Sequence, residues 1–174
     1  DGDRWTWRNE LLGTVRTFTV GDDDSLPEGP LAFLGSQIQD DVVLLDQREG
    51  ALWADAGLVT FAADWSMGFD CGMRFLEVHG PVPRVHEAGV VQRAEQFLMR
   101  LQSGEEYRRT NWTMTVDRRL DTSTETYAEW GRDRRLVVED PALPDRLHLR
   151  VEVQHLIRLG VSNAICFLVR TYLL

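Results

Sequence analysis

The clearest periodic pattern in the chain is helical, and it lies in the middle of the sequence. Apolar residues recur there at three- and four-residue spacing: Val90, Val91, Ala94, Phe97, Leu98 and Leu101. This spacing places them on one face of a helix, and Gly104 offers a natural stop. Pro81 and Pro83 exclude a helix interior just before the segment. The pattern predicts a helix over residues 85–102.

Alternating patterns after this helix predict strands. Residues 111–117 alternate, which is typical of a half-buried strand, and we expect the large side chain of Trp112 to pack in the core. Residues 147–154 alternate over their whole length. Residues 162–172 form a mostly apolar strand that can pair with its predecessor through a turn near Gly160.

Shorter runs of apolar and β-branched residues predict further strands before the helix, at 14–20, 42–45 and 58–62. Glu49-Gly50 offers turn chemistry between the last two of these strands. Residues 122–145 are polar and interrupted by two prolines, so we expect a loop with about one helical turn.

The order of these elements favours an α+β fold. Antiparallel strands dominate, and one long helix stands between strand pairs, so an antiparallel sheet with helices packed on one face is expected. A PAS-like domain fits this order. The 174 residues are enough for a hydrophobic core, and we expect a single domain over 1–174.

Composition narrows the classes of function. The formal net charge of −9 disfavours nucleic acid as a partner, because binding to phosphates needs concentrated cations. All basic residues are arginines, which excludes a lysine Schiff base and a Walker lysine. No apolar run is long enough to cross a bilayer and no signal peptide is recognisable, so a soluble cytoplasmic protein without a membrane partner is expected. We expect Cys71 and Cys166 to be reduced.

Two groups of residues could carry chemistry. His79 stands between a glycine-interrupted segment and Pro81, a stiff setting that suits either a structural histidine or an axial ligand. Arg150, Glu152 and Gln154 share one face of a predicted strand, and that face either meets solvent or binds a ligand.

The other three histidines remain secondary candidates. His86 lies near the start of the predicted helix, where an exposed position is common. His148 and His155 are seven residues apart on one strand, so they point to opposite faces and cannot share a metal.

Four sequence blocks, in order, carry a family resemblance. They are Gln39-Asp40-Asp41-Val42-Val43-Leu44-Leu45, the segment from Gly57 through Trp65 to His79-Gly80-Pro81-Val82-Pro83, Arg109-Thr110-Asn111-Trp112, and the strand pair from Leu149 to Tyr172. The chain resembles the haem-dependent oxidative N-demethylase-like family in these blocks. It departs from the family pattern at Val153, His155 and Gly160, and its N-terminal part looks shortened. These departures bear on the substrate more than on the fold.

The resemblance implies a PAS-like fold with haem as the cofactor. It implies His79 as the ligand of the haem iron, with further contacts to the cofactor from Arg84, Arg109, Asn111 and Gln154. Glu152 and Arg150 are the implied catalytic residues, because Glu152 can orient an amine or accept a proton.

The resemblance also implies a reaction. A haem-dependent monooxygenase would use dioxygen to oxidise a small amine, releasing formaldehyde by oxidative N-demethylation, with electrons from a separate reductase protein. The alternatives are a non-catalytic haem- or ligand-binding sensor module of PAS type, a family member redirected to another substrate, and an inactive relative without cofactor. A homo-oligomer is also left open.

Overall fold

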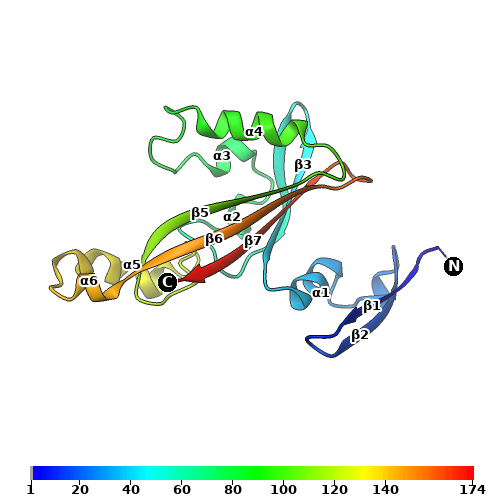
Figure 1. Ribbon diagram of the computed structural model, residues 1–174, viewed down its shortest axis with the longest axis horizontal. Helices are drawn as coiled ribbons and strands as arrows, with labels where there is room; N and C mark the ends of the chain where they lie inside the picture. Colours follow the sequence, from blue (N-terminus) through cyan, green and yellow to red (C-terminus); the bar gives the residue numbers. More distant parts are fainter. Residues whose placement is uncertain (1) are drawn as a thin grey trace. The chain divides into compact units, whose positions relative to one another are not determined.

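The computed structural model describes residues 2–174, except for the side chains of 133–135. The chain divides into two compact units, Asp1–Asp40 and Asp41–Leu174 (Figure 1). Whether they form the single domain expected from the sequence stays a prediction.

The first unit is a hairpin followed by a helix. Its elements are β1 (Arg4–Asn9), β2 (Thr14–Thr19), the 3-10 helix η1 (Asp23–Ser25) and α1 (Pro30–Gln37). The rings of Trp7 and Phe18 pack edge-on against Phe33, with ring centroids 6.2 and 5.9 Å apart. β2 confirms the predicted strand at 14–20. β1 was not predicted, because its charged residues interrupt the alternation of apolar and polar residues that is typical of a strand.

The second unit contains the main sheet. Its elements are β3 (Asp41–Arg48), β4 (Ala51–Leu58), α2 (Met67–Asp70), α3 (Phe75–Val78), α4 (Val90–Arg100), β5 (Glu106–Val116), α5 (Tyr127–Leu136), η2 (Val137–Glu139), α6 (Leu143–Arg146), β6 (Leu147–Arg158) and β7 (Ile165–Leu173). The strands pair antiparallel in the order β4-β3-β7-β6-β5. This arrangement confirms the expected α+β fold.

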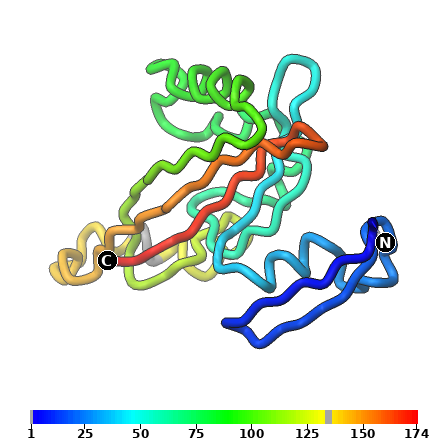
Figure 2. Tube along the Cα trace, turned by 45° about the vertical axis from the view of Figure 1, so that its right-hand side comes forward, coloured from blue at the N-terminus to red at the C-terminus, as the bar shows by residue number. Residues whose placement is uncertain are grey.

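The core lies between this sheet and α4. Leu156 of β6 and Ile165 of β7 belong to the same buried cluster as Leu98 and Leu101. Figures 1 and 2 show α3 and α4 together beside the sheet, and α5 and α6 together at the end of the β5–β6 pair. The buried cluster that includes Leu98 and Leu101 therefore covers one end of this sheet face. Polar residues lie at the other end.

Three predicted boundaries are wrong. The long helix begins at Val90 and not at residue 85, because turns continue to Gly89, whose φ of 62° starts the helix. The strand predicted at 58–62 lies earlier, as β4, since the turn at Glu49-Gly50 is tight and both residues have positive φ. Residues 122–145 hold α5, η2 and α6 in place of the predicted loop.

The two faces of β5 are the reverse of what the sequence suggested. Trp112 was expected in the core, yet 66% of its surface is exposed, whereas Thr115 is buried. Alternation defines the two faces of a strand but not which face is covered. The hydroxyl- and amide-bearing face of β5 is the one that becomes covered, at Asn111 in part and at Thr115 fully, whereas Arg109 and Thr113 on the same face are exposed.

Two further expectations concern the cysteines and the membrane. Both cysteines are free thiols, and Cys71 is exposed. Among the described residues, no helix combines the length and the apolar character that crossing a membrane requires.

Candidate functional site

His79 is held at the end of a short helix that is anchored in the core. Phe75 and Val78 of α3 pack against the buried cluster. His79 follows directly as the C-terminal capping residue of α3. The Nδ1 atom of His79 lies 2.7 Å from the carbonyl oxygen of Phe75, and the two rings are in contact at 4.3 Å between centroids. The imidazole is therefore fixed in orientation by its own helix.

This hydrogen bond determines the tautomer of His79. A carbonyl oxygen only accepts, so Nδ1 carries the proton and Nε2 keeps its lone pair. Burial, the largest effect, lowers the pKa of His79 and favours the neutral ring. A neutral imidazole whose second nitrogen donates to a backbone carbonyl is the usual form of a metal-ligating histidine.

Charged groups surround His79. The charges of His86 and Arg109 lower the pKa of His79 further, whereas Asp70 raises it, so all three lie close enough to act on the ring. Asp70 at the end of α2 is buried, and burial raises the pKa of its carboxyl group. Asp70 was not predicted from the sequence, because nothing in its glycine-interrupted segment marks the residue as buried.

A polar network covers the middle of the β5–β6 pair. The carboxylate of Glu152 accepts hydrogen bonds from Nε2 of Gln154 at 2.9 Å and from Nε of Arg150 at 3.3 Å. Nδ2 of Asn111, directly across on β5, donates at 3.4 Å. Only 15% of the Glu152 side chain is exposed. Arg150, Glu152 and Gln154 therefore share a largely buried face, and the solvent-facing alternative is wrong.

Arg150 connects this network to two loops. Its side chain is 2% exposed, and its guanidinium donates to the carbonyl oxygens of Phe61 and Leu120 and to Oγ1 of Thr171 at 3.3 Å. The donors of Arg150 are thus largely occupied by the protein itself. This geometry favours a positioning role over direct contact with a substrate.

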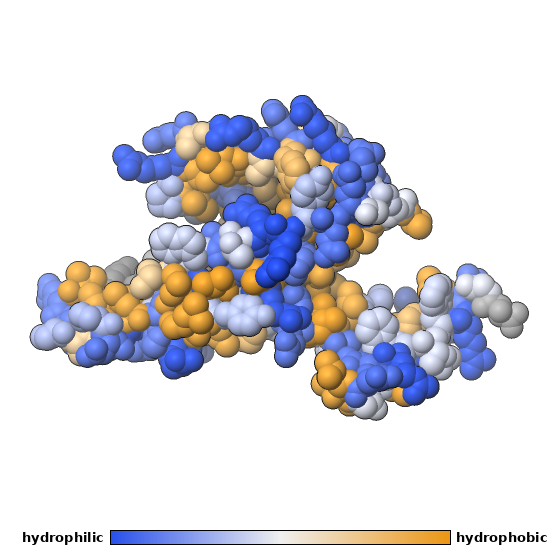
Figure 3. Space-filling view, viewed as in Figure 1, coloured by the Kyte–Doolittle hydropathy of each residue, from blue (hydrophilic) through white to orange (hydrophobic). Residues whose placement is uncertain are grey.

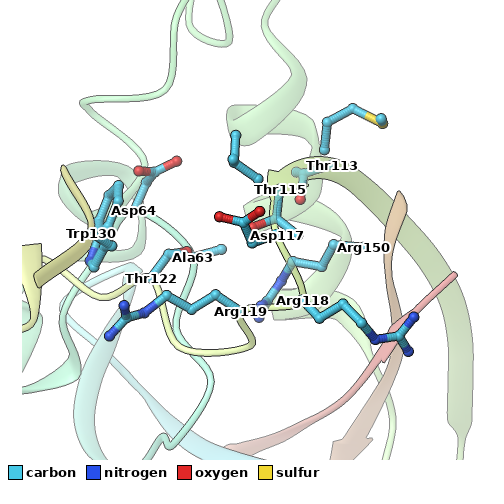
Figure 4. A pocket seen from close by; sticks show the side chains of 12 residues that line it. Ala63, Asp64, Thr113, Thr115, Asp117, Arg118, Arg119, Thr122, Trp130 and Arg150 are labelled. Atoms are coloured by element: carbon cyan, nitrogen blue, oxygen red, sulfur yellow. The ribbon is translucent and has the colours of Figure 1, made fainter. Parts of the chain in front are cut away.

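A cavity of about 440 Å³ adjoins Arg150. It is lined by Ala63, Asp64, Thr113, Met114, Thr115, Val116, Asp117, Arg118, Arg119, Thr122, Trp130 and Arg150. Figure 4 shows Asp64 and Trp130 on one side of the cavity, with Thr115 and Arg150 on the other. Thr113 and Thr115 share a strand face with Arg109 and Asn111, so this face of β5 leads from the surroundings of His79 to the cavity.

The family comparison agrees with this donor set. A family model described as haem-dependent oxidative N-demethylase, alpha subunit-like, matches residues 1–174. The chain belongs to this family. Its relatives are thus named as haem-dependent oxidative enzymes, which confirms the resemblance drawn from the four sequence blocks.

This N-demethylase-like chain offers one imidazole, that of His79, in the form that usually ligates a metal. Within the described residues, no three or more His, Cys, Asp or Glu side chains are grouped to hold a metal. A haem iron needs only one axial ligand from the protein, because the porphyrin supplies the others. Figure 3 shows the surface hollowed between the layer of α3 and α4 and the β5–β6 strands. His79 follows directly on α3.

The remaining residues that the sequence singled out make fewer contacts with His79 and with the polar network around Glu152. Arg109 is exposed on β5, and Arg84 is exposed in the turn after Pro83 with φ at 63°. His86 is exposed, with Nδ1 3.4 Å from Nε2 of Gln92. His148 is paired across from Thr115 on the covered face, and His155 lies on the opposite face of β6.

Proposed function

We propose that this chain binds haem through Nε2 of His79 and uses it to oxidise a small amine by oxidative N-demethylation. The observation that supports this proposal most directly is the hydrogen bond from Nδ1 of His79 to the carbonyl of Phe75. It leaves the lone pair of Nε2 available for iron on a ring that burial keeps neutral. The family supplies the haem dependence.

Other residues near His79 would hold the cofactor. Arg109 and Arg84 are cationic and exposed, so their planar guanidinium groups can pair with the propionates of haem. Asn111 and Gln154 lie on the covered faces of β5 and β6 and can add polar contacts. We propose that the covering helices and this sheet face together form a PAS-like haem pocket.

Glu152 is the carboxylate best suited to the amine. It is largely buried, and three side-chain donors fix its orientation. An anion held in this way can bind an ammonium group and take its proton, which frees the nitrogen lone pair. Arg150 would keep Glu152 in place and hold the two loops beside the cavity closed.

The overall reaction balances with two electrons from outside the chain. A methylamine, dioxygen, two electrons and two protons give the demethylated amine, formaldehyde and water. Bound haem would supply the activation of dioxygen. A separate reductase protein would supply the electrons.

Formaldehyde release tests this function. Haem-loaded protein, a chemical reductant, air and a set of methylated amines should yield formaldehyde together with the demethylated amine. Glu152→Gln should lower turnover by about a hundredfold, in the range that general acid–base groups contribute. Glu105→Gln, on the exposed turn before β5, is the matched control and should leave turnover unchanged. Stable haem binding without formaldehyde from any methylated amine would contradict the proposal and favour a sensor.

A further inference from the structure

β5 is an edge strand along its whole length. The sheet order places β5 at one end, next to β6 alone, and no other described strand pairs with it. In Figures 1 and 2 no further strand runs beside β5 on its outer side. Eleven residues is long for an unprotected edge, since natural proteins usually shorten, cover or charge such strands to prevent pairing with other chains.

The pairing with β6 shows which backbone groups face outward. The backbone N–H of Asp117 donates to the carbonyl of Arg146 at 2.7 Å, in register with the β5–β6 pairs. In an antiparallel pair these hydrogen-bonded positions alternate along the strand. The N–H and C=O groups of Thr110, Trp112 and Met114 therefore point away from β6. They form a ready template for another strand.

The side chains at these positions are unusually apolar for an edge. Trp112 is 66% exposed and Met114 is 53% exposed, both on the uncovered face of the sheet. Tyr172 continues the same face two strands inward and is 46% exposed. Neighbouring cross-strand pairs of large side chains are the main source of stability between strands.

A second copy of β5 fits this edge in one register. If the two-fold axis passes through Trp112, antiparallel pairing places Trp112 opposite its own copy. The other opposed positions are then Thr110 with Met114, Arg108 with Val116, Arg109 with Thr115, and Glu106 with the turn that carries Arg118. All outward backbone groups of one strand then face those of the other. Each copy also brings one carboxylate to one arginine of its partner.

Charge selects this register over its neighbours. Centring the two-fold on Arg109 would place that residue against itself, and centring it on Thr113 would place Arg108 against Arg118. Centring it on Asn111 would place Glu105 against Asp117, two groups of like charge. Among registers that overlap most of β5, the Trp112-centred one pairs opposite charges and opposes no like charges.

We propose that two copies of this chain associate through their β5 edges in this register, forming one antiparallel sheet of ten strands, five from each copy. The interface is isologous, as most homodimer interfaces are. Its central contact is the Trp112 pair, flanked on each side by Thr110 and Met114. The formal charge of −9 on each copy opposes association at long range, so the dimer should be measured at about 0.15 M salt, where such repulsion is screened.

Sedimentation equilibrium of haem-loaded protein tests the edge contact. The wild type should be a dimer at micromolar concentration. Thr110→Pro should be a monomer, because proline removes an outward N–H that β6 does not use, and edge strands tolerate it. Tyr172→Lys is the matched control on the same sheet face, and it should remain a dimer because β7 is not at the edge. Circular dichroism should show both variants folded.

Each other outcome overturns the proposal. A monomeric wild type, or a dimer that survives Thr110→Pro, shows that the edge does not pair. A dimer lost only in Tyr172→Lys shows that the sheets pack face to face.

A charge exchange tests the register. Glu106→Arg should weaken the dimer about tenfold, because it replaces two attractions with two repulsions at an exposed interface. Adding Arg118→Glu to that variant should restore the wild-type dissociation constant. If the double variant stays as weak as the single one, the two residues do not face each other and the Trp112-centred register is wrong.

Discussion

Two arginines on one face of β6 are buried to the same degree, but their surroundings differ. Arg150 and Arg158 are 2% and 3% exposed. Arg158 donates to the carbonyl oxygens of Leu98 and Leu101 at the end of α4, at 2.7 and 3.0 Å, and to that of Asn163. Burial lowers its pKa, and no carboxylate among the described residues compensates for it.

The surroundings of Arg150 contain a carboxylate and a cavity in place of a helix end. Arg150 also donates to two backbone carbonyls, but its Nε meets Glu152, and its loops border the cavity. The carbonyls at the end of a helix need donors, and Arg158 supplies them, so that half of the strand is structural. A buried arginine that also orients a buried carboxylate marks the half suited to chemistry.

Replacing Arg150 should have the largest effect on stability. Arg150→Met leaves Glu152 without its cation and two carbonyls without donors, so the free energy of unfolding should fall by about 4 kcal/mol. Urea unfolding measures this loss. The double variant Arg150→Met/Glu152→Met should recover part of it, because the pair is coupled. Full additivity of the two substitutions would show that Glu152 does not depend on Arg150.

Arg158→Met should lower the free energy of unfolding somewhat less, by about 3 kcal/mol, because only hydrogen bonds to neutral carbonyls are lost. The effect should be confined to the structural half. Hydrogen exchange should rise at the end of α4 but not at Phe61 or Leu120. Arg100→Met, at the exposed end of the same helix, is the control and should change stability by less than about 0.5 kcal/mol. Equal hydrogen exchange at both ends of the sheet would show that Arg158 does not act on the α4 end alone.

The smallest expected effect is a pH dependence at His79. Burial lowers its pKa in the folded state, so below about pH 6.5 the unfolded chain binds more protons than the folded one. The contribution of His79 to stability is complete above that pH and is lost as the pH falls toward the folded-state pKa. Unfolding of wild type and His79→Ala between pH 5 and 7.5 should converge at the acid end. Parallel curves would show that the ring is not buried as a neutral group.

Alternation was enough to predict the polar face of β6. Because side chains alternate along a strand, Arg150, Glu152 and Gln154 had to share one side. Alternation could not reveal that this side is the covered one, since coverage depends on how Phe61 and Leu120 pack against Arg150. The same limit explains why Trp112 was wrongly expected in the core.

His79 was found through the family resemblance, and its tautomer only through the structure. No residue spacing in the sequence predicts the hydrogen bond from Nδ1 of His79 to the carbonyl oxygen four residues earlier. Asp70 and Trp130 were missed because their burial comes from the short α2 and from α5, in segments whose composition predicted irregular backbone.

Haem titration of His79→Ala tests the central claim most directly. The wild type should bind one haem per chain with an intense absorption band, and His79→Ala should lose most of that affinity and regain a similar spectrum when free imidazole is added. His155→Ala, on the uncovered face of β6, should bind haem as the wild type does. Unchanged haem affinity and an unchanged spectrum in His79→Ala would contradict the assignment of His79 as the axial ligand.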